Sequence, residues 1–227
     1  MVLAAKVFLL REETDLETLA MKLRDYRVDE VFEEDEYRIP LLTEVRDLAF
    51  RADSLEGIFA RDKVIFMPHR GKVVPVPKTL EAPFLFTQRG DRVLLTVVEK
   101  KERANSIANE LSKVLFIIAG RIVEARITPE VLKRFHEDNF EDTKVIFFDD
   151  VDVPNVAKLS LYGSELGNTA LYNDYLTHGK IWYTVVRSRK YGYVVGVTRN
   201  AVVTVFSRVE TSDFITYITN EIFPLLE

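Results

Sequence analysis

Residues 91–116, DRVLLTVVEKKERANSIANELSKVLF, decide the fold class predicted for this chain. Residues 92–98 are branched and apolar and follow a turn, which predicts a strand. The residues after them place large apolar side chains on one stripe at helical spacing, which predicts a helix over residues 102–118. The stripe consists of Ile107, Leu111, Val114 and Leu115. A strand followed by an amphipathic helix indicates a sheet that is covered by helices.

A second segment of the same kind spans residues 200–226, with Phe214, Ile215, Ile218, Ile222 and Phe223 as its helical stripe. An offset of 108 residues aligns the two segments without a gap and also superposes residues 71–74 on residues 179–182. Identities at this offset are Gly71 and Gly179, Lys72 and Lys180, Thr96 and Thr204, Val97 and Val205, and Ile107 and Ile215. Self-similarity at a fixed period predicts an internal duplication. The alternative is that two unrelated strand–helix units share a common apolar pattern.

Each half of the chain has the same predicted order of elements: strand, helix, several strands, helix. This order predicts an α+β fold of two pseudo-repeated halves, residues 1–119 and 120–227, each an antiparallel sheet with helices on one face. The predicted strands cover residues 6–10, 42–51, 58–67, 72–76, 83–87, 92–98, 121–127, 144–148, 156–162, 180–186, 191–198 and 201–207. The predicted helices cover residues 15–26, 102–118, 129–137 and 212–226, with Thr14 or Asp15 capping the first and Thr128 the third.

The connecting segments carry predictions of their own. The acidic run of residues 25–36 is predicted to be a solvated loop, and a turn is predicted near residues 60–62. Residues 161–179 form the longest predicted irregular insert and are the best candidate for a functional loop. Gly71 and Gly179 are each predicted to sit at positive φ in a tight turn that enters a strand. Prolines at 75, 77 and 83 place that section at a sheet edge, because proline cannot donate to a ladder.

The composition is that of a globular protein, with 47% hydrophobic and 30% charged residues. No apolar run approaches the roughly 18 residues that span a bilayer, and residues 2–10 resemble a first strand rather than a signal peptide. The absence of cysteine excludes disulfides and thiolate zinc sites, and it fits an intracellular, cytoplasmic protein. A single glutamine beside many glutamates, lysines and arginines suggests a thermophilic source.

Motifs of known enzyme classes are missing from the sequence, including phosphate-binding glycine loops, Gly-x-Ser-x-Gly and His-Glu-x-x-His. The histidines His69, His136 and His178 are well separated, so isolated histidines are a better interpretation than a shared metal site. Residues 149–152 offer three aspartates that suit a hard cation, although such a run is also typical of a solvated strand end. The sequence therefore favours a non-catalytic protein over an enzyme, and it indicates no metal or cofactor site.

The strongest charge anomaly is basic, in a chain whose net charge is −5. Residues 176–209 contain six lysines and arginines and no acidic residue. Within them, residues 187–193 read RSRKYGY, in which Arg187, Arg189 and Lys190 suit phosphates and Tyr191 and Tyr193 suit unpaired bases. If the neighbouring strands pair, the same surface gains Lys180, Trp182, Arg199 and Arg208. The alternatives are a basic hairpin whose tyrosines pack on the sheet, or a contact with residues 29–36 of another copy.

The order of elements resembles that of the TATA-binding protein family, whose two halves form a saddle with a concave sheet. The resemblance covers most of both halves as topology. At residue level it consists of residues 15–20, DLETLA, at the place of the first helix, and of Phe84 and Phe86 before the turn at Gly90 and Asp91. It implies a role for the two phenylalanines as wedges in a DNA minor groove. The second half departs from the family, because Tyr193 and Val195 stand near the corresponding place and the asparagine-bearing strand motifs are absent.

From these observations we expect a non-catalytic, intracellular binding or scaffold protein. It would recognise a protein partner or a second copy of itself through a sheet face and the hairpin at residues 187–193. The second hypothesis is a nucleic-acid-binding protein that uses the same basic and aromatic surface. A third hypothesis is a small-molecule pocket between helices and sheet, or an enzyme site in residues 161–179.

Overall fold

The computed structural model describes residues 2–51, 53–139 and 143–227. The chain forms two compact units, which we call the central unit and the terminal unit. The central unit is Leu9–Val123, and the terminal unit combines Glu124–Glu227 with the N-terminal residues up to Phe8. This division differs from the predicted halves, because β1 (Leu3–Leu10) pairs with β12 (Val202–Val205) near the other end of the chain.

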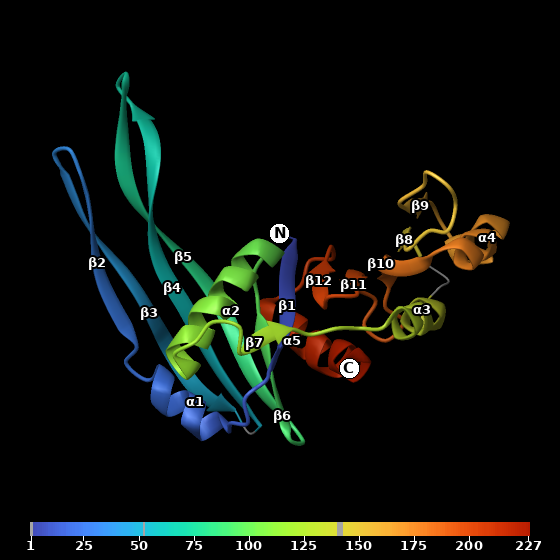
Figure 1. The fold of residues 1–227 in the computed structure, drawn as a ribbon, viewed down its shortest axis with the longest axis horizontal. Helices are drawn as coiled ribbons and strands as arrows, with labels where there is room; N and C mark the ends of the chain where they lie inside the picture. Colours follow the sequence, from blue (N-terminus) through green and yellow to red (C-terminus); the bar gives the residue numbers. More distant parts are fainter. Residues whose placement is uncertain (1, 52, 140–142) are drawn as a thin grey trace. The chain divides into compact units, whose positions relative to one another are not determined.

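Both units combine antiparallel strands with helices, which confirms the α+β class (Figure 1). The internal duplication and the resemblance to the TATA-binding protein family stay predictions. No helix among the described residues is long and apolar enough to cross a lipid bilayer.

The central unit has the strand order β2-β3-β4-β5-β6. The strands are β2 (Arg27–Glu34), β3 (Tyr37–Arg51), β4 (Ser54–His69), β5 (Lys72–Arg89) and β6 (Arg92–Val97). Helices α1 (Leu16–Leu23) and α2 (Lys101–Phe116) pack against this sheet (Figure 1). The predicted stripe of α2 points to the core, where Leu111 and Leu115 are fully buried, and Leu19 of α1 is fully buried as well.

The ends of both helices follow from local chemistry. Asp15 caps α1 by accepting a hydrogen bond from the backbone N–H of Thr18, which is one of the two predicted caps. Helix α2 ends before the predicted residue 118, because Ile117 adopts a left-handed conformation with φ of 66°. Its side chain is 90% exposed, so the helical stripe stops at Leu115.

The acidic run is a strand, and the prediction of a loop over residues 25–36 is wrong. Strand β2 pairs with β3 along its whole length, from Arg27 opposite Glu44 to Glu34 opposite Tyr37. Asp35, with φ of 51°, makes the tight turn between them. The carboxylates remain in solvent on the outer strand, where like charges discourage pairing with another such edge. Because almost all side chains of β2 are exposed, its sequence does not show the alternation of apolar and polar residues that identifies a half-buried strand.

The predicted strands at 58–67, 72–76 and 83–87 belong to two longer strands. β4 and β5 pair without interruption from Ser54 opposite Thr87 to His69 opposite Lys72. The turn predicted near residues 60–62 is therefore wrong, while the turn at Arg70 and Gly71 is confirmed, with φ values of 47° and 80°.

Two hairpins extend beyond the five-stranded region of the central unit (Figure 1). Pairing between β3 and β4 stops at Thr43 opposite Arg61, and pairing between β5 and β6 begins at Phe84 opposite Val97. We call residues 27–42 the acidic ribbon and residues 62–80 the basic ribbon. Each is a two-stranded hairpin without a helix packed along it in the view of Figure 1.

The terminal unit has the strand order β1-β12-β11-β10-β8-β9. Its other strands are β7 (Ile122–Glu124), β8 (Val145–Asp149), β9 (Leu159–Tyr162), β10 (Lys180–Arg187) and β11 (Val194–Thr198). Its helices are α3 (Pro129–Asp138), α4 (Ala170–His178) and α5 (Thr211–Tyr217). The chain continues from α5 through a π-helical turn (Ile218–Ile222) and a 3-10 turn (Phe223–Leu225) that contains Pro224.

Two predictions for the terminal unit are wrong. Residues 161–179 are not an irregular insert, because Thr169 caps helix α4, which runs to His178. Gly179 ends that helix with an extended backbone, φ −154°, so it does not share the positive φ of Gly71. A Cβ at Gly179 would lie 3.1 Å from the carbonyl oxygen of Asp149 and 3.2 Å from Cβ of Phe148, so close packing rather than a turn explains this glycine.

Close packing also explains Gly57 in the core of the central unit. Gly57 on β4 lies opposite Phe84 on β5, and a Cβ at Gly57 would lie 2.7 Å from ring atom Cζ of Phe84. Phe84 is only 1% exposed and packs edge-to-face on Phe86, so its ring has little room to move.

We expect Gly57→Ala to lower the free energy of unfolding by about 1–3 kcal/mol, because it overpacks this core. Urea denaturation measures the loss. Combined with Phe84→Leu, the same alanine should cost less, and an equal cost in both backgrounds would contradict the steric explanation.

The terminal unit contains a buried polar triad. His136 on α3 is completely buried, and its Nδ1 lies 3.1 Å from the hydroxyl of Tyr172 and its Nε2 3.0 Å from that of Thr143. A neutral ring satisfies this arrangement by donating one hydrogen bond and accepting the other. Burial lowers the pKa of His136 from 6.5 to about 4.

This shift predicts a loss of stability in mild acid. The unfolded chain binds a proton at His136 near pH 6.5 and the folded chain does so only near pH 4, so stability is complete above pH 6.5 and falls as the pH drops through this window. Between pH 7 and pH 5 we expect a loss of about 2 kcal/mol from this group in urea denaturation. His136→Gln should abolish this part, whereas His69→Gln, at an exposed turn, should retain it. Equal pH dependence of all three proteins would contradict the assignment.

Candidate binding surfaces

The basic hairpin at residues 187–193 is anchored to its own unit. Lys190 forms an ion pair with Glu221 at 2.9 Å, and this contact raises the pKa of Lys190. The backbone N–H of Arg189 donates to Asn139 at 3.0 Å, and the guanidinium of Arg187 donates to the carbonyl of Gly192 at 3.3 Å. Groups of this hairpin that we expected to contact a partner therefore bind residues of the same unit.

The tyrosines of this hairpin pack on the final helical segment. Tyr191 and Tyr193 have ring centroids 5.2 Å and 6.0 Å from that of Tyr217, a buried residue of α5. The amide of Asn220 also donates to the hydroxyl of Tyr191 at 3.0 Å. The arrangement matches the alternative of a hairpin whose tyrosines pack on the fold.

Arg199 and Lys180 lie near the acidic end of β8. The guanidinium of Arg199 pairs with the carboxylate of Asp149 and lies 3.7 Å from that of Asp150. Lys180 is exposed and opposite Asp149 in the register of β10 and β8. Asp152 pairs with His178 at 2.8 Å. Asp149 and Asp150 thus have the guanidinium of Arg199 as a partner and Asp152 has the ring of His178, and no group of three potential metal ligands occurs within residues 2–51, 53–139 and 143–227.

Phe84 and Phe86 do not fit the wedge role that the resemblance implied. Both side chains are almost completely buried in the central unit, with ring centroids 5.6 Å apart. A wedge must be exposed to enter a groove, so this role is corrected to one in the core.

Trp182 belongs to an aromatic cluster on the less buried face of the terminal sheet. The register between β10 and β8 shifts at this residue, with Ile181 opposite Phe148 and Tyr183 opposite Phe147. Trp182 is the extra residue of a β-bulge, which directs two successive side chains to one face. Trp182 and Tyr183 therefore both contact Phe147, with ring centroids 5.6 Å and 5.3 Å from it.

The cluster is completed from neighbouring strands. Tyr162 on β9 lies edge-on to Phe147 at 5.6 Å and is 68% exposed. The ammonium of Lys158 lies 4.9 Å from the centroid of Trp182, a cation–π contact. Tyr183 covers Gly196, where a Cβ would lie 2.5 Å from the tyrosine hydroxyl, and burial raises the pKa of Tyr183. We call these five residues, Phe147, Lys158, Tyr162, Trp182 and Tyr183, the aromatic cluster.

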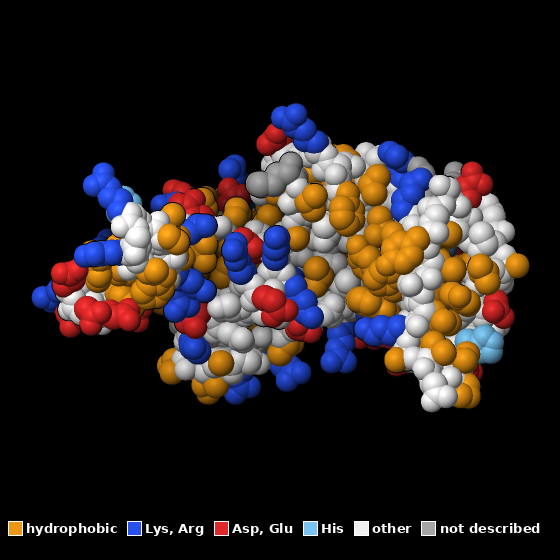
Figure 2. Space-filling view, turned by 90° about the horizontal axis from the view of Figure 1, so that it is seen from above, with side chains coloured by type: hydrophobic (Ala, Val, Ile, Leu, Met, Phe, Trp, Pro, Cys, Tyr) orange, Lys and Arg blue, Asp and Glu red, His pale blue; other side chains and the backbone are white. Residues whose placement is uncertain are grey.

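The ribbons of the central unit form a different kind of surface. Large apolar side chains are exposed on both: Val31 is 51% exposed, Phe66 56%, Met67 48% and Val73 64%. Figure 2 shows orange side chains at the left of the molecule, between a tip with red carboxylates and a tip with blue cations. These tips carry opposite charge. The acidic ribbon has six carboxylates and two arginines, and the basic ribbon has three lysines, one arginine and one carboxylate.

Contacts between the two ribbons are limited. Phe32 and Phe66 meet edge-to-face at 6.3 Å, and Asp62 accepts a hydrogen bond from the backbone N–H of Leu42 at 3.0 Å. The ion pairs of the acidic ribbon, Arg27 with Asp29 and Arg38 with Glu33, are internal. Among the described residues, no ion pair joins the acidic ribbon to the cations of the basic ribbon.

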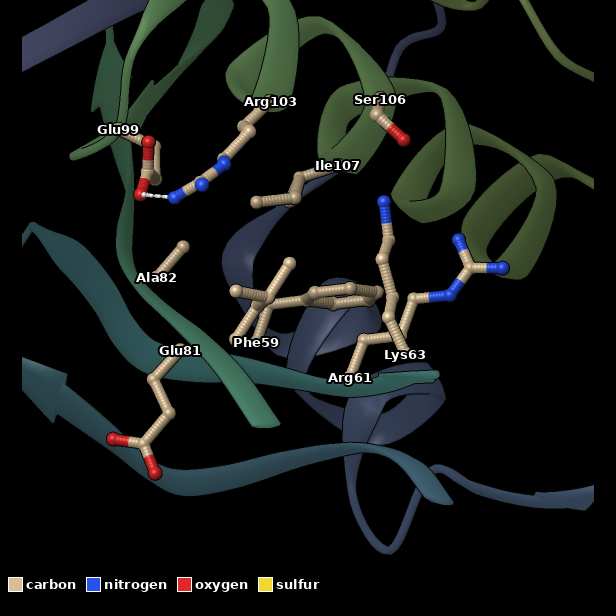
Figure 3. Close-up of a pocket in the computed structure, with 10 residues that line it drawn as sticks. Phe59, Arg61, Lys63, Glu81, Ala82, Glu99, Arg103, Ser106 and Ile107 are labelled. Carbon is tan, nitrogen blue, oxygen red and sulfur yellow. Dashed lines mark hydrogen bonds and ion pairs between the residues drawn. The ribbon is translucent and has the colours of Figure 1, made fainter. Parts of the chain in front are cut away.

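A pocket lies at the root of the basic ribbon, where β4 and β5 face α2. Figure 3 shows Arg61 and Lys63 extending from β4 toward α2, with the ring of Phe59 beside them and Arg103 bonded to Glu99. The pocket holds about 40 Å³, the share of one or two water molecules and far below the roughly 300 Å³ of a typical small-molecule site. Its geometry does not favour the small-molecule hypothesis.

A wider groove follows the end of α2. It has a volume of about 520 Å³ and is lined by Phe116, Ile117 and Ile118. Its polar groups are already engaged: Lys22 donates to the carbonyl of Leu115, and Arg121 pairs with Glu12 at 3.0 Å. These residues therefore do not provide the converging polar groups that would orient a small ligand.

Sequence reasoning found Trp182 but missed its companions. A bulge cannot be recognised from alternation, so Phe147, Tyr162 and Tyr183 gave no sign of sharing a face with Trp182. The ribbons were missed because their residues were divided between a loop and three short strands. The signal that could have found the basic ribbon is the apolar run of residues 64–68, VIFMP, beside the glycine turn at residues 70–71.

A comparison of the chain with protein-family models finds no match, and a comparison with curated proteins finds no significant one.

Proposed function

We propose that this protein is a non-catalytic binding protein that holds a protein partner through its two ribbons. The observation that carries the proposal is the exposure of Val31, Phe66, Met67 and Val73 on two-stranded hairpins. Exposed apolar side chains gathered in one region mark interaction sites more often than scattered ones do.

The length of the strands supports this function. β4 and β5 have 16 and 18 residues, whereas strands of about five or six residues are usual. An isolated two-stranded hairpin is only marginally stable in water, because one pair of strands cannot bury its own apolar side chains. A partner that covers these side chains would stabilise the ribbons. The surface proposed to bind the partner is therefore in the central unit, and not the hairpin at residues 187–193 that we expected from the sequence.

Lysine-directed cross-linking tests this proposal, because the basic ribbon carries Lys63, Lys72 and Lys78. In an extract of the source cells, we expect cross-links to a partner protein to concentrate on these lysines. Lys100, Lys101 and Lys133 serve as controls, since they are solvent-accessible and lie outside the ribbons. Phe66→Ser with Val73→Ser should reduce the ribbon cross-links several-fold. Cross-links spread evenly over both sets of lysines would contradict the proposal.

A second candidate function is binding of single-stranded nucleic acid on the aromatic cluster. Its support is the bulge at Trp182, which gathers four aromatic rings and Lys158 on one sheet face. Aromatic rings provide stacking platforms for unpaired bases, and a nearby ammonium favours the phosphate backbone.

The single tryptophan of the chain makes this candidate directly measurable. If bases stack on the cluster, a thymine oligonucleotide should quench the fluorescence of Trp182, with an affinity that falls log-linearly with salt. Tyr162→Ala should weaken binding about fivefold or more, because one stacking contact is lost. Leu171→Ala, an exposed apolar residue of α4, should leave it unchanged. Unchanged fluorescence at low salt would exclude this candidate.

A further inference from the structure

We infer that the partner of the ribbons is a second copy of this chain, with the acidic ribbon of one copy against the basic ribbon of the other. This inference rests on the proposed function, because it identifies the occupant of the same surface. It is carried by a second observation: the ribbons have opposite charge, and among the residues that the structure describes no salt bridge pairs them with one another in one copy.

The charges that remain for a partner can be named. Glu30, Glu34, Asp35 and Glu36 are exposed carboxylates outside the two internal ion pairs of the acidic ribbon. On the basic ribbon, Lys63, Arg70, Lys72 and Lys78 are exposed, and within the described parts of the chain none of them has a carboxylate within 4.0 Å. Both sets are therefore complementary and accessible at once.

Like charges exclude the simpler ways in which two copies could meet. Two acidic ribbons placed side by side would bring carboxylates together, and two basic ribbons would bring lysines together. The remaining arrangement places the acidic ribbon of one copy against the basic ribbon of the other. In a twofold dimer this contact forms twice, since each copy supplies both ribbons to the other.

Apolar side chains supply the remaining part of the interface. On the basic ribbon, Met67 shares one face with Lys63, Lys72 and Lys78, and Phe66 and Val73 share the opposite face. On the acidic ribbon, Val31 shares a face with Asp29 and Glu33. An apolar centre with a charged rim is the usual composition of a specific protein interface. The charges then select the orientation of the copies, and the burial of the apolar side chains contributes to affinity.

Light scattering coupled to size-exclusion chromatography tests the inference. At about 50 mM salt and up to about 100 µM protein, we expect a mass of twice the 26.2 kDa of one copy, decreasing toward one copy at about 500 mM salt. Phe66→Ser with Val73→Ser should remain monomeric at low salt. A single-copy mass of the unmodified protein under all these conditions would overturn the inference.

A charge exchange provides the sharper experiment. Lys72→Glu with Lys78→Glu makes both ribbons acidic, and Glu30→Lys with Glu34→Lys and Glu36→Lys makes both basic, so each variant alone should be mostly monomeric. An equimolar mixture should regain the doubled mass, because each acidic ribbon then meets a basic one. A mixture that stays monomeric while the unmodified protein dimerises would exclude this pairing.

The matched control is Lys100→Glu with Lys101→Glu. It makes the same change of charge at the start of α2, where acidic residues are favourable, and it should dimerise like the unmodified protein. Circular dichroism and thermal melting identify any variant that fails to fold. If the unmodified protein is monomeric yet Lys63, Lys72 and Lys78 cross-link to a different protein, self-association is wrong and the proposed function stands.

Discussion

The continuous pairing of β4 with β5 is the constraint on which the central unit depends. It runs through sixteen residue pairs without a bulge, so one register fixes the buried and exposed side chains along both strands. At one end, Phe59, Phe84 and Phe86 enter the core under α2. At the other end, the same register leaves Phe66, Met67 and Val73 in solvent. A slip by one residue would turn the phenylalanines out of the core, so their burial fixes the register of the whole hairpin, the ribbon included.

In the terminal unit, the aromatic cluster results from a β-bulge that shifts the register between β10 and β8. The bulge at Trp182 places two adjacent aromatic residues on one face, and Gly196 leaves room for the ring of Tyr183. The basic hairpin beyond it is held by Glu221, Asn139 and Asn220. The two units therefore present different chemistry: half-buried rings on a sheet face in one, and apolar side chains between charged ones in the other.

The sequence predicted the elements that bury an apolar stripe. The cap at Asp15, the helix after Thr128 and the strand before α2 were recognisable, because burial imposes a period and capping requires particular side chains. The exposed strand β2 was not, since RVDEVFEE has the composition of a loop and its structure comes from backbone pairing with β3. Helix α4 was missed because it buries only Tyr172 among its nine residues. The aromatic cluster depends on a bulge, which is a tertiary feature.

The prolines of β5 restrict how a partner can be recognised. Pro75, Pro77 and Pro83 occupy alternate positions of one register, and the carbonyl of Pro83 accepts from Val98, on the side away from β4. The nitrogens of Pro75 and Pro77, at positions of the same parity, thus face the outer edge of the basic ribbon, where no N–H is available at these two positions to bond an added strand. Extension of the sheet along this edge of β5 would lack the hydrogen bonds at these two positions. A partner on this edge therefore depends more on the side chains of the ribbon, and its specificity depends on amino-acid sequence more than on the common geometry of the peptide backbone.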